Sequence, residues 1–196
     1  MIRKDDIEIR TAKPEDANEL LNIYAYYVIK TAISFETEVP SLYEFKKRIE
    51  RTLEKYPYIL VLKDGEISGY VYLSPFVGRS AYDWSAETTI YLKPDKKKGG
   101  LGRILYKIIE RIGREQNITN LYSCIGYAEK EDKYLNNNSL QFHEHMGYRL
   151  VGKFYNCGHK FNRWYSMVWM EKIINKHKNV KEVIPFNKTN IYKDLL

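Results

Sequence analysis

Apolar and polar residues alternate along this chain in two periods, one typical of strands and one typical of helices. Residues 7–11, Ile-Glu-Ile-Arg-Thr, alternate at every second position and predict a strand. Pro14 suits the first position of a helix, and the two acidic residues after it favour the first turn. The helix that follows is expected to bury Leu20, Leu21, Ile23, Tyr24 and Tyr27 or Val28.

Capping and turn signals predict the next elements. Ser41-Leu-Tyr-Glu44 is a capping box, which opens a second helix running toward Lys55. Strands are predicted at residues 58–63 and 66–73, and Asp64-Gly65 between them is a typical two-residue hairpin turn.

A longer strand is predicted at residues 81–92, and the glycine-rich segment 99–102 then leads into an amphipathic helix. The remaining elements are a strand at 121–125, a short helix at 136–146 closed by Gly147, and a final hairpin of strands at 148–156 and 164–171. The order βααβββαβαββ predicts an α/β or α+β sheet protein and argues against a helical bundle or a barrel.

Length and composition place the chain among ordinary folded domains. It has 196 residues, 44% of them hydrophobic, which fits one domain with a short extension. No apolar run approaches the roughly 18 residues that a membrane span needs, and the first six residues lack the apolar stretch of a signal peptide. Cys124 and Cys157 make neither a disulfide framework nor a zinc site, and we expect them to be ordinary small hydrophobic residues in a cytoplasmic protein.

The net charge of +7 fits a nucleic acid, an anionic membrane or a phosphorylated ligand as partner, so the position of the charge matters. One lysine cluster lies at residues 93–98, beside the glycine-rich turn. Another runs from Lys172 to Lys193 and is expected to be a solvated tail. Within it, the apolar residues 183–186 leave open a docking contact with the body of the protein or with a partner.

The turn Lys97-Lys-Gly-Gly-Leu-Gly102 is the strongest chemical signal. Glycines between a strand and a helix expose backbone N–H groups, and the helix N-terminus adds partial positive charge, so the turn suits a phosphate or pyrophosphate. A Walker loop is absent, and Leu105 stands where a dinucleotide fingerprint needs its third glycine. Without further context, a plain strand-to-helix turn remains the alternative.

The pattern of a basic residue, two positions and Gly-x-Gly after a central strand resembles the acetyl-CoA pyrophosphate loop of the GNAT acetyltransferase superfamily. That family usually has Gln or Arg at the first position, where this chain has Lys97. The order of elements over residues 7–172 is also similar. The resemblance implies a GNAT acyltransferase fold, with a mixed, mostly antiparallel sheet flanked by helices. Residues 1–172 would form this domain, and residues 173–196 a C-terminal extension.

Five separated blocks narrow the resemblance to the phosphinothricin N-acetyltransferase branch. In chain order they are Ser34-Phe-Glu-Thr-Glu38, Pro75 to Tyr91, Asn136-x-x-Ser139, His143-Glu-x-x-Gly147, and Gly158-x-Lys160 with Trp164. Two departures touch the substrate side: Val77 stands where many relatives have a second basic residue, and residues 127–135 resemble an insertion.

The resemblance assigns roles to two sets of residues. Acetyl-CoA would be bound by Ile90, Tyr91, Leu92, Lys97, Lys98, Gly99, Gly100, Leu101, Gly102, Arg103, Asn136 and Ser139. The acceptor would be bound by Phe35, Glu36, Arg79, Tyr82 and Lys160, with Arg79 pairing with a substrate carboxylate. Simpler readings stay open, with Asn136 as a helix N-cap, Arg79 as a solvated side chain and the aromatic residues as core. Relatives form twofold dimers, so a homodimer is expected.

Two residues are candidates for proton transfer. Glu87 lies in a mostly apolar strand, where a carboxylate is costly unless it has a use, and the resemblance favours it as general base for the acceptor amine. The alternative is a structural Glu paired with an Arg or a backbone group. His143 takes the position from which relatives reach the coenzyme sulfur, and it would protonate the leaving thiolate, or else be a packing residue on a helix face.

These observations favour an acetyl-CoA-dependent acetyltransferase that acts on the amino group of a small, amino-acid-like acceptor, with phosphinothricin and methionine sulfone or sulfoximine as the types. An alternative keeps the fold but makes the acceptor a protein N-terminus or lysine. A basic nucleic-acid-binding module is less favoured, because the lysines lie outside any recognisable nucleic-acid motif. We therefore expect no nucleic acid, membrane or metal among its partners.

Overall fold

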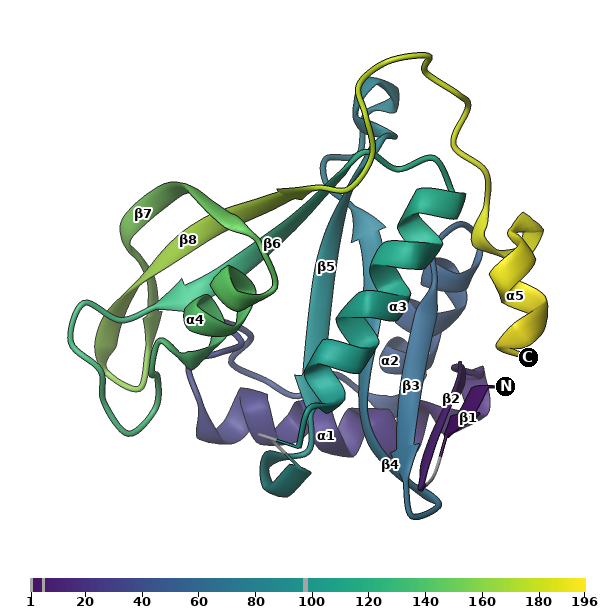
Figure 1. Cartoon of the computed structure of the whole chain (residues 1–196). Coiled ribbons are helices and arrows are strands. Elements are labelled where there is room, and N and C mark those ends of the chain that lie inside the picture. The colour runs from purple at the N-terminus through teal and green to yellow at the C-terminus, as the bar shows by residue number, and fades with distance from the viewer. Residues whose placement is uncertain (1, 5, 97–98) are drawn as a thin grey trace.

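A single sheet runs through the computed structural model, which describes residues 2–4, 6–96 and 99–196. The described part contains eight strands in the order β1-β2-β3-β4-β5-β6-β8-β7 (Figure 1). Their bounds are β1 Ile2–Lys4, β2 Ile7–Thr11, β3 Tyr58–Lys63, β4 Glu66–Pro75, β5 Ser85–Leu92, β6 Asn120–Tyr127, β7 Arg149–Lys160 and β8 Arg163–Ile173. Neighbours are antiparallel except β5 and β6, which run parallel. The predicted mixed, mostly antiparallel sheet is confirmed.

Helices cover both faces of the sheet (Figure 1). They are α1 Ala17–Lys30, α2 Leu42–Leu53, α3 Leu101–Glu115, α4 Asn138–His145 and α5 Asn190–Asp194. Because side chains alternate along a strand, β3 contributes residues to the hydrophobic core on each face of the sheet. Ile59 and Val61 pack on the α3 side, whereas Tyr58 and Leu60 pack on the side of α1 and α2.

Local signals in the sequence account for several element boundaries. The predicted cap of α2 is present, since the Ser41 side chain accepts a hydrogen bond from the Glu44 N–H at 3.2 Å. The predicted hairpin turn is also present, with Asp64 and Gly65 at φ values of 53° and 78°. Of the residues predicted to be buried on α1, only Leu21 is half-buried instead.

The predicted strand at 81–92 was four residues too long at its start. Residues Ser80–Tyr82 form a turn of 3₁₀ helix, and β5 begins at Ser85. The apolar residues there resemble a strand, but β4 ends at Pro75, which pairs with Ala86, so no partner extends further. The chain satisfies its backbone groups locally instead, with Tyr82 N–H donating to the Arg79 carbonyl at 2.9 Å.

The C-terminal extension is not the solvated tail that its charge predicted. Phe186, Ile191 and Leu195 are each at most 1% exposed and belong to the core on the α3 side. The N–H of Thr11 donates to the Leu195 carbonyl at 2.7 Å, which ties the end of the chain to β2. Figure 1 shows this segment arching over the sheet before it returns to α5. The lysines of this segment are exposed, whereas the apolar residues between them are spaced so that they pack into the core. The lysine content alone therefore gave the wrong prediction.

Across the described residues, no helix is both long and apolar enough to cross a membrane.

Candidate active site

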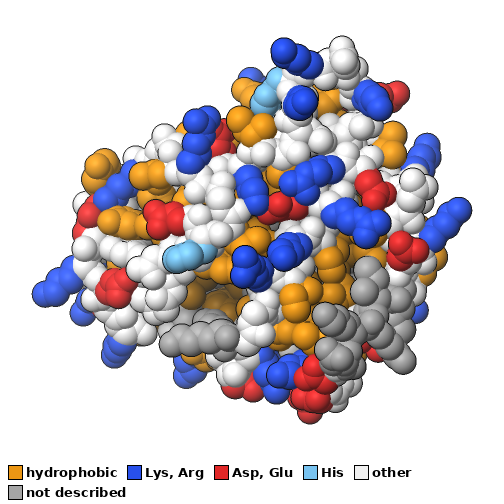
Figure 2. All heavy atoms as spheres, viewed as in Figure 1, with side chains coloured by type: hydrophobic (Ala, Val, Ile, Leu, Met, Phe, Trp, Pro, Cys, Tyr) orange, Lys and Arg blue, Asp and Glu red, His pale blue; other side chains and the backbone are white. Residues whose placement is uncertain are grey.

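Strands β5 and β6 separate soon after they begin. Their parallel pairing covers three residue pairs and ends at Glu87 opposite Tyr122. Beyond this point the two strands diverge and leave a narrow cavity of about 60 Å³. The lining residues come from both strands, from α3 and α4, and from the loops after α1 and before α4: Ile33, Thr88, Thr89, Ile90, Tyr91, Tyr106, Ser123, Cys124, Ile125, Gly126, Leu135, Ser139 and His143. We call this cavity the slot. Figure 2 shows a recess with a hydrophobic floor on this face of the molecule.

One end of the slot meets the N-terminus of α3. Gly100 caps the helix with φ 79° and ψ −7°, a left-handed conformation that favours glycine. Gly102 lies in the first turn, where an added Cβ would be 3.2 Å from the Phe142 ring of α4. Both glycines thus let the chain turn tightly and keep the first helical N–H groups open to an anion. Lys97 and Lys98 lie outside the described residues, whereas Gly99 and Arg103 are exposed beside the turn.

The remaining expected coenzyme residues fall into three groups. Ile90, Tyr91 and Ser139 line the slot. Leu92 lies at the end of β5, where its carbonyl accepts a hydrogen bond from the Tyr27 hydroxyl. Asn136 is exposed, and its side chain accepts from the Asn138 N–H at 3.2 Å, so it supports the start of α4.

His143 is buried in the wall of the slot and has partners at both ring nitrogens. Its Nδ1 lies 2.7 Å from the Ser139 carbonyl, which can only accept, so Nδ1 carries the proton. Nε2 lies 2.5 Å from the Tyr106 hydroxyl and therefore accepts from it. Burial lowers the pKa of His143 to about 4. The ring is neutral at pH 7, and in this arrangement neither nitrogen directs a proton into the slot.

Glu87 lies where the pairing of β5 with β6 ends. Its neighbour Ala86 is buried in the core on the α3 side, so the alternation of the strand directs Glu87 to the opposite face. Burial raises the pKa of the Glu87 carboxyl above its usual value. Among the described residues no Arg or Lys forms an ion pair with it, which does not fit the structural alternative of a Glu held by a basic partner.

A second carboxylate faces the same side of the sheet. Glu36 is bound by Arg48 of α2 at 2.7 Å, and the same guanidinium also holds Glu44 at 2.7 Å. Burial raises the pKa of the Tyr72 hydroxyl, and the charges of both Glu87 and Glu36 raise it further. Tyr72 is therefore within electrostatic reach of both carboxylates.

The segment 76–84, which we call the acceptor loop, folds over the beginning of β6. Phe76 stacks on Tyr122 with ring centroids 4.1 Å apart and contacts Trp169 edge-on at 5.4 Å. Tyr82 meets the edge of Phe76 at 6.0 Å. Arg79 is exposed, and its guanidinium has no hydrogen bond or ion pair with any residue that the structure describes. The loop thus carries a free cation next to an aromatic patch.

The final hairpin closes the site from the other side. Gly158 lies so close to Phe35 that an added Cβ would be 2.3 Å from the ring. Lys160 is buried and donates from Nζ to the Ser34 carbonyl at 2.7 Å, and burial lowers its pKa. In this arrangement Lys160 ties the hairpin to the segment that carries Phe35 and Glu36.

Both cysteines, which we expected to be ordinary small hydrophobic residues, are exposed. Cys124 lines the slot, and its recessed position raises the pKa of its thiol to about 12, with a further contribution from Glu87. A thiol with such a pKa is a poor nucleophile, which agrees with the expectation that it has no catalytic role.

Sequence reasoning missed several residues of the site. Tyr106 and Arg48 look like ordinary members of amphipathic helices, and Phe76 and Tyr122 are far apart along the chain. No local sequence signal distinguishes these four residues from ordinary core or surface residues, because each one acts through a contact with a residue on another element. Only the Pro75-Phe76 pair lay in a block that the family resemblance had marked.

The fold defines a class of enzyme, the acyltransferases built on a mixed, mostly antiparallel sheet flanked by helices. The chain belongs to the GNAT acetyltransferases, because the family model of the Acetyltransferase (GNAT) domain matches residues 9–169. It is accordingly an N-acetyltransferase that uses acetyl-CoA as acyl donor.

Named relatives agree with this assignment. The chain is 31% identical over 171 residues to a phosphinothricin N-acetyltransferase of Streptomyces coelicolor, covering 85% of this chain and 96% of the relative. It is 27% identical over 166 residues to another of Streptomyces viridochromogenes, covering 85% and 87%. A solved phosphinothricin acetyltransferase of Sinorhizobium meliloti in complex with acetyl-CoA has a TM-score of 0.82 at 25% identity, covering 96% and 97%.

The neutral His143 predicts a distinct pH dependence of stability. Its folded pKa of about 4 lies below the ordinary 6.5, so the unfolded chain takes up a proton first as the pH falls. This proton uptake lowers the free energy of unfolding by about 3 kcal/mol between pH 7 and pH 4.

The variant His143→Gln has no titrating group at this position. Its free energy of unfolding should therefore not show this loss between pH 7 and pH 4. Urea unfolding of both proteins from pH 4 to pH 8 measures the difference. His145→Gln, at an exposed position on the same helix, is the matched control and should follow the wild type. Parallel curves for wild type and His143→Gln would show that His143 is not held neutral.

Proposed function

We propose that this enzyme acetylates the amino group of a small, amino-acid-like acceptor of the phosphinothricin, methionine sulfone or methionine sulfoximine type. The observation that carries the proposal is the position of Glu87, where β5 and β6 part, beside the slot and on the face that carries the acceptor loop. The resemblance and the relatives, which are phosphinothricin N-acetyltransferases, support the acceptor class. We also place the reaction in the cytoplasm, in line with two unpaired cysteines.

In the proposed reaction, the N-terminus of α3 holds the pyrophosphate of acetyl-CoA, and the slot admits the arm that carries the thioester. The acceptor approaches from the face of Glu87. Glu87 takes a proton from the acceptor ammonium, through a water, and the free amine then attacks the thioester carbonyl. The C–N bond forms and the C–S bond breaks. The nitrogen gives up its second proton as the amide forms, and the thiolate that leaves takes up one proton, so the step balances. The raised pKa of Glu87 brings its proton affinity closer to neutral pH, where a general base works best.

Arg79 is proposed to bind the carboxylate of the acceptor. It is a cation on the acceptor loop with no partner among the described side chains, and a guanidinium pairs well with a carboxylate. Tyr82, Phe35 and the Arg48-bound Glu36 form the rest of the proposed acceptor surface. A protein acceptor is the alternative, and it would dispense with the pairing at Arg79.

We further propose that the enzyme is a homodimer with a twofold interface formed by the final hairpin. The hairpin exposes apolar side chains, each more than half exposed: Leu150, Val151, Phe154, Tyr155 and Trp164. Such a contiguous element of apolar residues is typical of an interaction surface.

Light scattering at micromolar concentration should therefore give twice the chain mass of 23.3 kDa, and Phe154→Glu should shift the protein toward the monomer. A wild-type mass of 23.3 kDa would contradict the dimer without affecting the acyl transfer.

The acceptor class predicts a clear substrate pattern in an acetyl-CoA turnover screen. Amino acids and their analogues should be acetylated, whereas simple amines without a carboxylate and peptide N-termini should react poorly. Arg79→Ala should raise the KM of the acceptor about 10- to 100-fold, as expected for a lost charge-assisted pair of about 1.5–3 kcal/mol. The KM of acetyl-CoA should stay unchanged.

Arg51→Ala removes the same charge from the exposed surface of α2 and is the matched control. Equal turnover of amino acids and simple amines, or of peptides, would count against an amino-acid acceptor.

The role of Glu87 predicts how a neutral isostere behaves. Glu87→Gln should lower kcat at pH 7 by about 10²–10⁴-fold, because the acceptor amine is then left protonated. Most of the loss should be recovered at high pH, where the amine loses its proton without help, and the affinity for acetyl-CoA should hardly change. His143→Ala, which tests the role in thiolate protonation that the resemblance implies, should cost less, because both ring nitrogens are already bound within the protein. If Glu87→Gln keeps full activity across the pH range, the base lies elsewhere, and Glu36 is the next residue to replace.

A further inference from the structure

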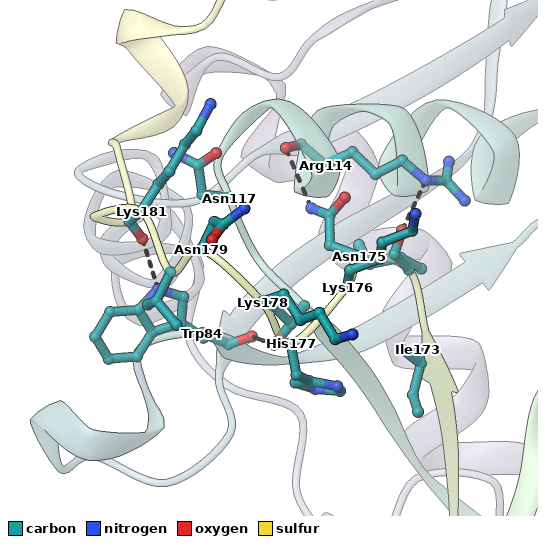
Figure 3. Close-up of a pocket in the computed structure, with 13 residues that line it drawn as sticks. Trp84, Arg114, Asn117, Ile173, Asn175, Lys176, His177, Lys178, Asn179 and Lys181 are labelled. Atoms are coloured by element: carbon teal, nitrogen blue, oxygen red, sulfur yellow. Dashed lines mark hydrogen bonds between the residues drawn. The ribbon is translucent and has the colours of Figure 1, made fainter.

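The C-terminal extension contacts the acceptor loop directly. Residues 174–189, which we call the strap, run from the end of β8 past the end of α3 to the docked C-terminus (Figures 1 and 3). Figure 3 shows Trp84, the last residue of the acceptor loop, beneath the strap, and its ring nitrogen donates to the Lys181 carbonyl at 2.7 Å. The family model ends at residue 169, so the strap lies outside the part of the chain that it matches.

Trp84 is also held from the sheet side. Its backbone carbonyl accepts from the N–H groups of Thr119 and Asn120 at 2.8 and 3.2 Å, and from the Thr119 hydroxyl at 3.1 Å. The strap reaches the same point, since the N–H of Ile174 donates to the Thr119 carbonyl at 2.8 Å. The ring and the backbone of Trp84 are therefore fixed by two different segments.

A second route links the strap to the preceding residue of the loop. The Lys55 carbonyl accepts from the strap at the Phe186 N–H and from the buried Gln116 side chain, both at 2.9 Å. Gln116 also donates to the Ile184 carbonyl of the strap at 2.9 Å. The fixed Lys55 then binds Asp83 of the loop from Nζ at 2.9 Å.

The strap has a firm support of its own. Phe186 is 1% exposed and meets the Tyr192 ring edge-on at 5.0 Å, so the far end of the strap is part of the core. Asn117 donates from its side chain to the Glu182 carbonyl at 2.8 Å. Between these anchors the strap borders a wide hollow of about 1030 Å³ lined by exposed lysines. The hollow lies where β5 and β6 begin, whereas the slot lies further along the same two strands. We assign the hollow no ligand, because no buried polar group is directed into it.

We propose that the strap is a positioning element for the acceptor site: it fixes the acceptor loop at Asp83 and Trp84, and thereby sets where Arg79 and Tyr82 meet the acceptor. This inference rests on the proposed function. The loop is otherwise held at Phe76 by its stacking on Tyr122, so the turn of residues 79–82 lies between one anchor in the sheet and one in the strap. Loss of the strap contacts leaves this end of the loop held through the backbone carbonyl of Trp84 and no longer through its ring or through Asp83.

The test uses Trp84→Phe in the full-length protein, which removes the ring donor but keeps an aromatic side chain. The KM of the acceptor should rise about three- to tenfold, as expected for one neutral hydrogen bond, while the KM of acetyl-CoA stays at the wild-type value. Lys55→Met, which breaks the ion pair with Asp83, should act in the same direction. Lys181→Ala is the control, because the group that accepts is its backbone oxygen, which the substitution leaves in place.

Two outcomes overturn the inference: an unchanged acceptor KM in Trp84→Phe, or an equal rise in both KM values with a lower Tm, which indicates general destabilisation. If the wild type acetylates no acceptor, the proposed function fails instead. Amide hydrogen exchange then decides the role of the strap. Faster exchange confined to residues 76–84 in Trp84→Phe supports it, and unchanged exchange overturns it.

Discussion

The parallel pairing of β5 with β6 stops after Glu87, and the rest of the site depends on this early end. Two strands that separate expose backbone and side chains that a continuous sheet would cover, and here the gap is lined by α3 and α4. The N-terminus of α3 follows β5 through the glycine turn, so the helix end proposed to hold the pyrophosphate lies next to the opening in the sheet. The same separation leaves Glu87 at the border between the slot and the proposed acceptor side.

The two faces of the sheet differ in charge around the opening between β5 and β6. On the slot side, His143 is neutral and bound to Tyr106, so this wall carries no cation at pH 7. On the other face, Glu87 is half-buried without an ion pair among the described residues, whereas Glu36 is fully engaged by Arg48. Burial raises the pKa of the Glu87 carboxyl. The two carboxylates thus differ in their neighbours and not in their residue type.

Much of the fold could be predicted from local signals. The capping box of Ser41, the Asp64-Gly65 turn and the amphipathic pattern of α3 each act within a few residues, so the sequence predicted them correctly. The glycine turn and the block around Glu87 were predicted to form the two halves of the site, and the structure places both next to the slot. The start of β5 was misjudged because a strand needs a partner, and β4 ends at Pro75. The tail was misjudged because lysine content says nothing about where Phe186 and Leu195 can dock.

The sequence by itself thus determined the order of the helices and strands from residue 7 to residue 173, the glycine turn before α3 and the position of one carboxylate in an apolar strand, because these depend on neighbours along the chain. The tertiary structure decided which residues support them. The Tyr106–His143 pair, the Arg48–Glu36 pair and the contact of Trp84 with the Lys181 carbonyl join residues 37, 12 and 97 positions apart. The sequence around either residue of such a pair does not predict the contact, because the contact forms only when the folded sheet brings distant segments together.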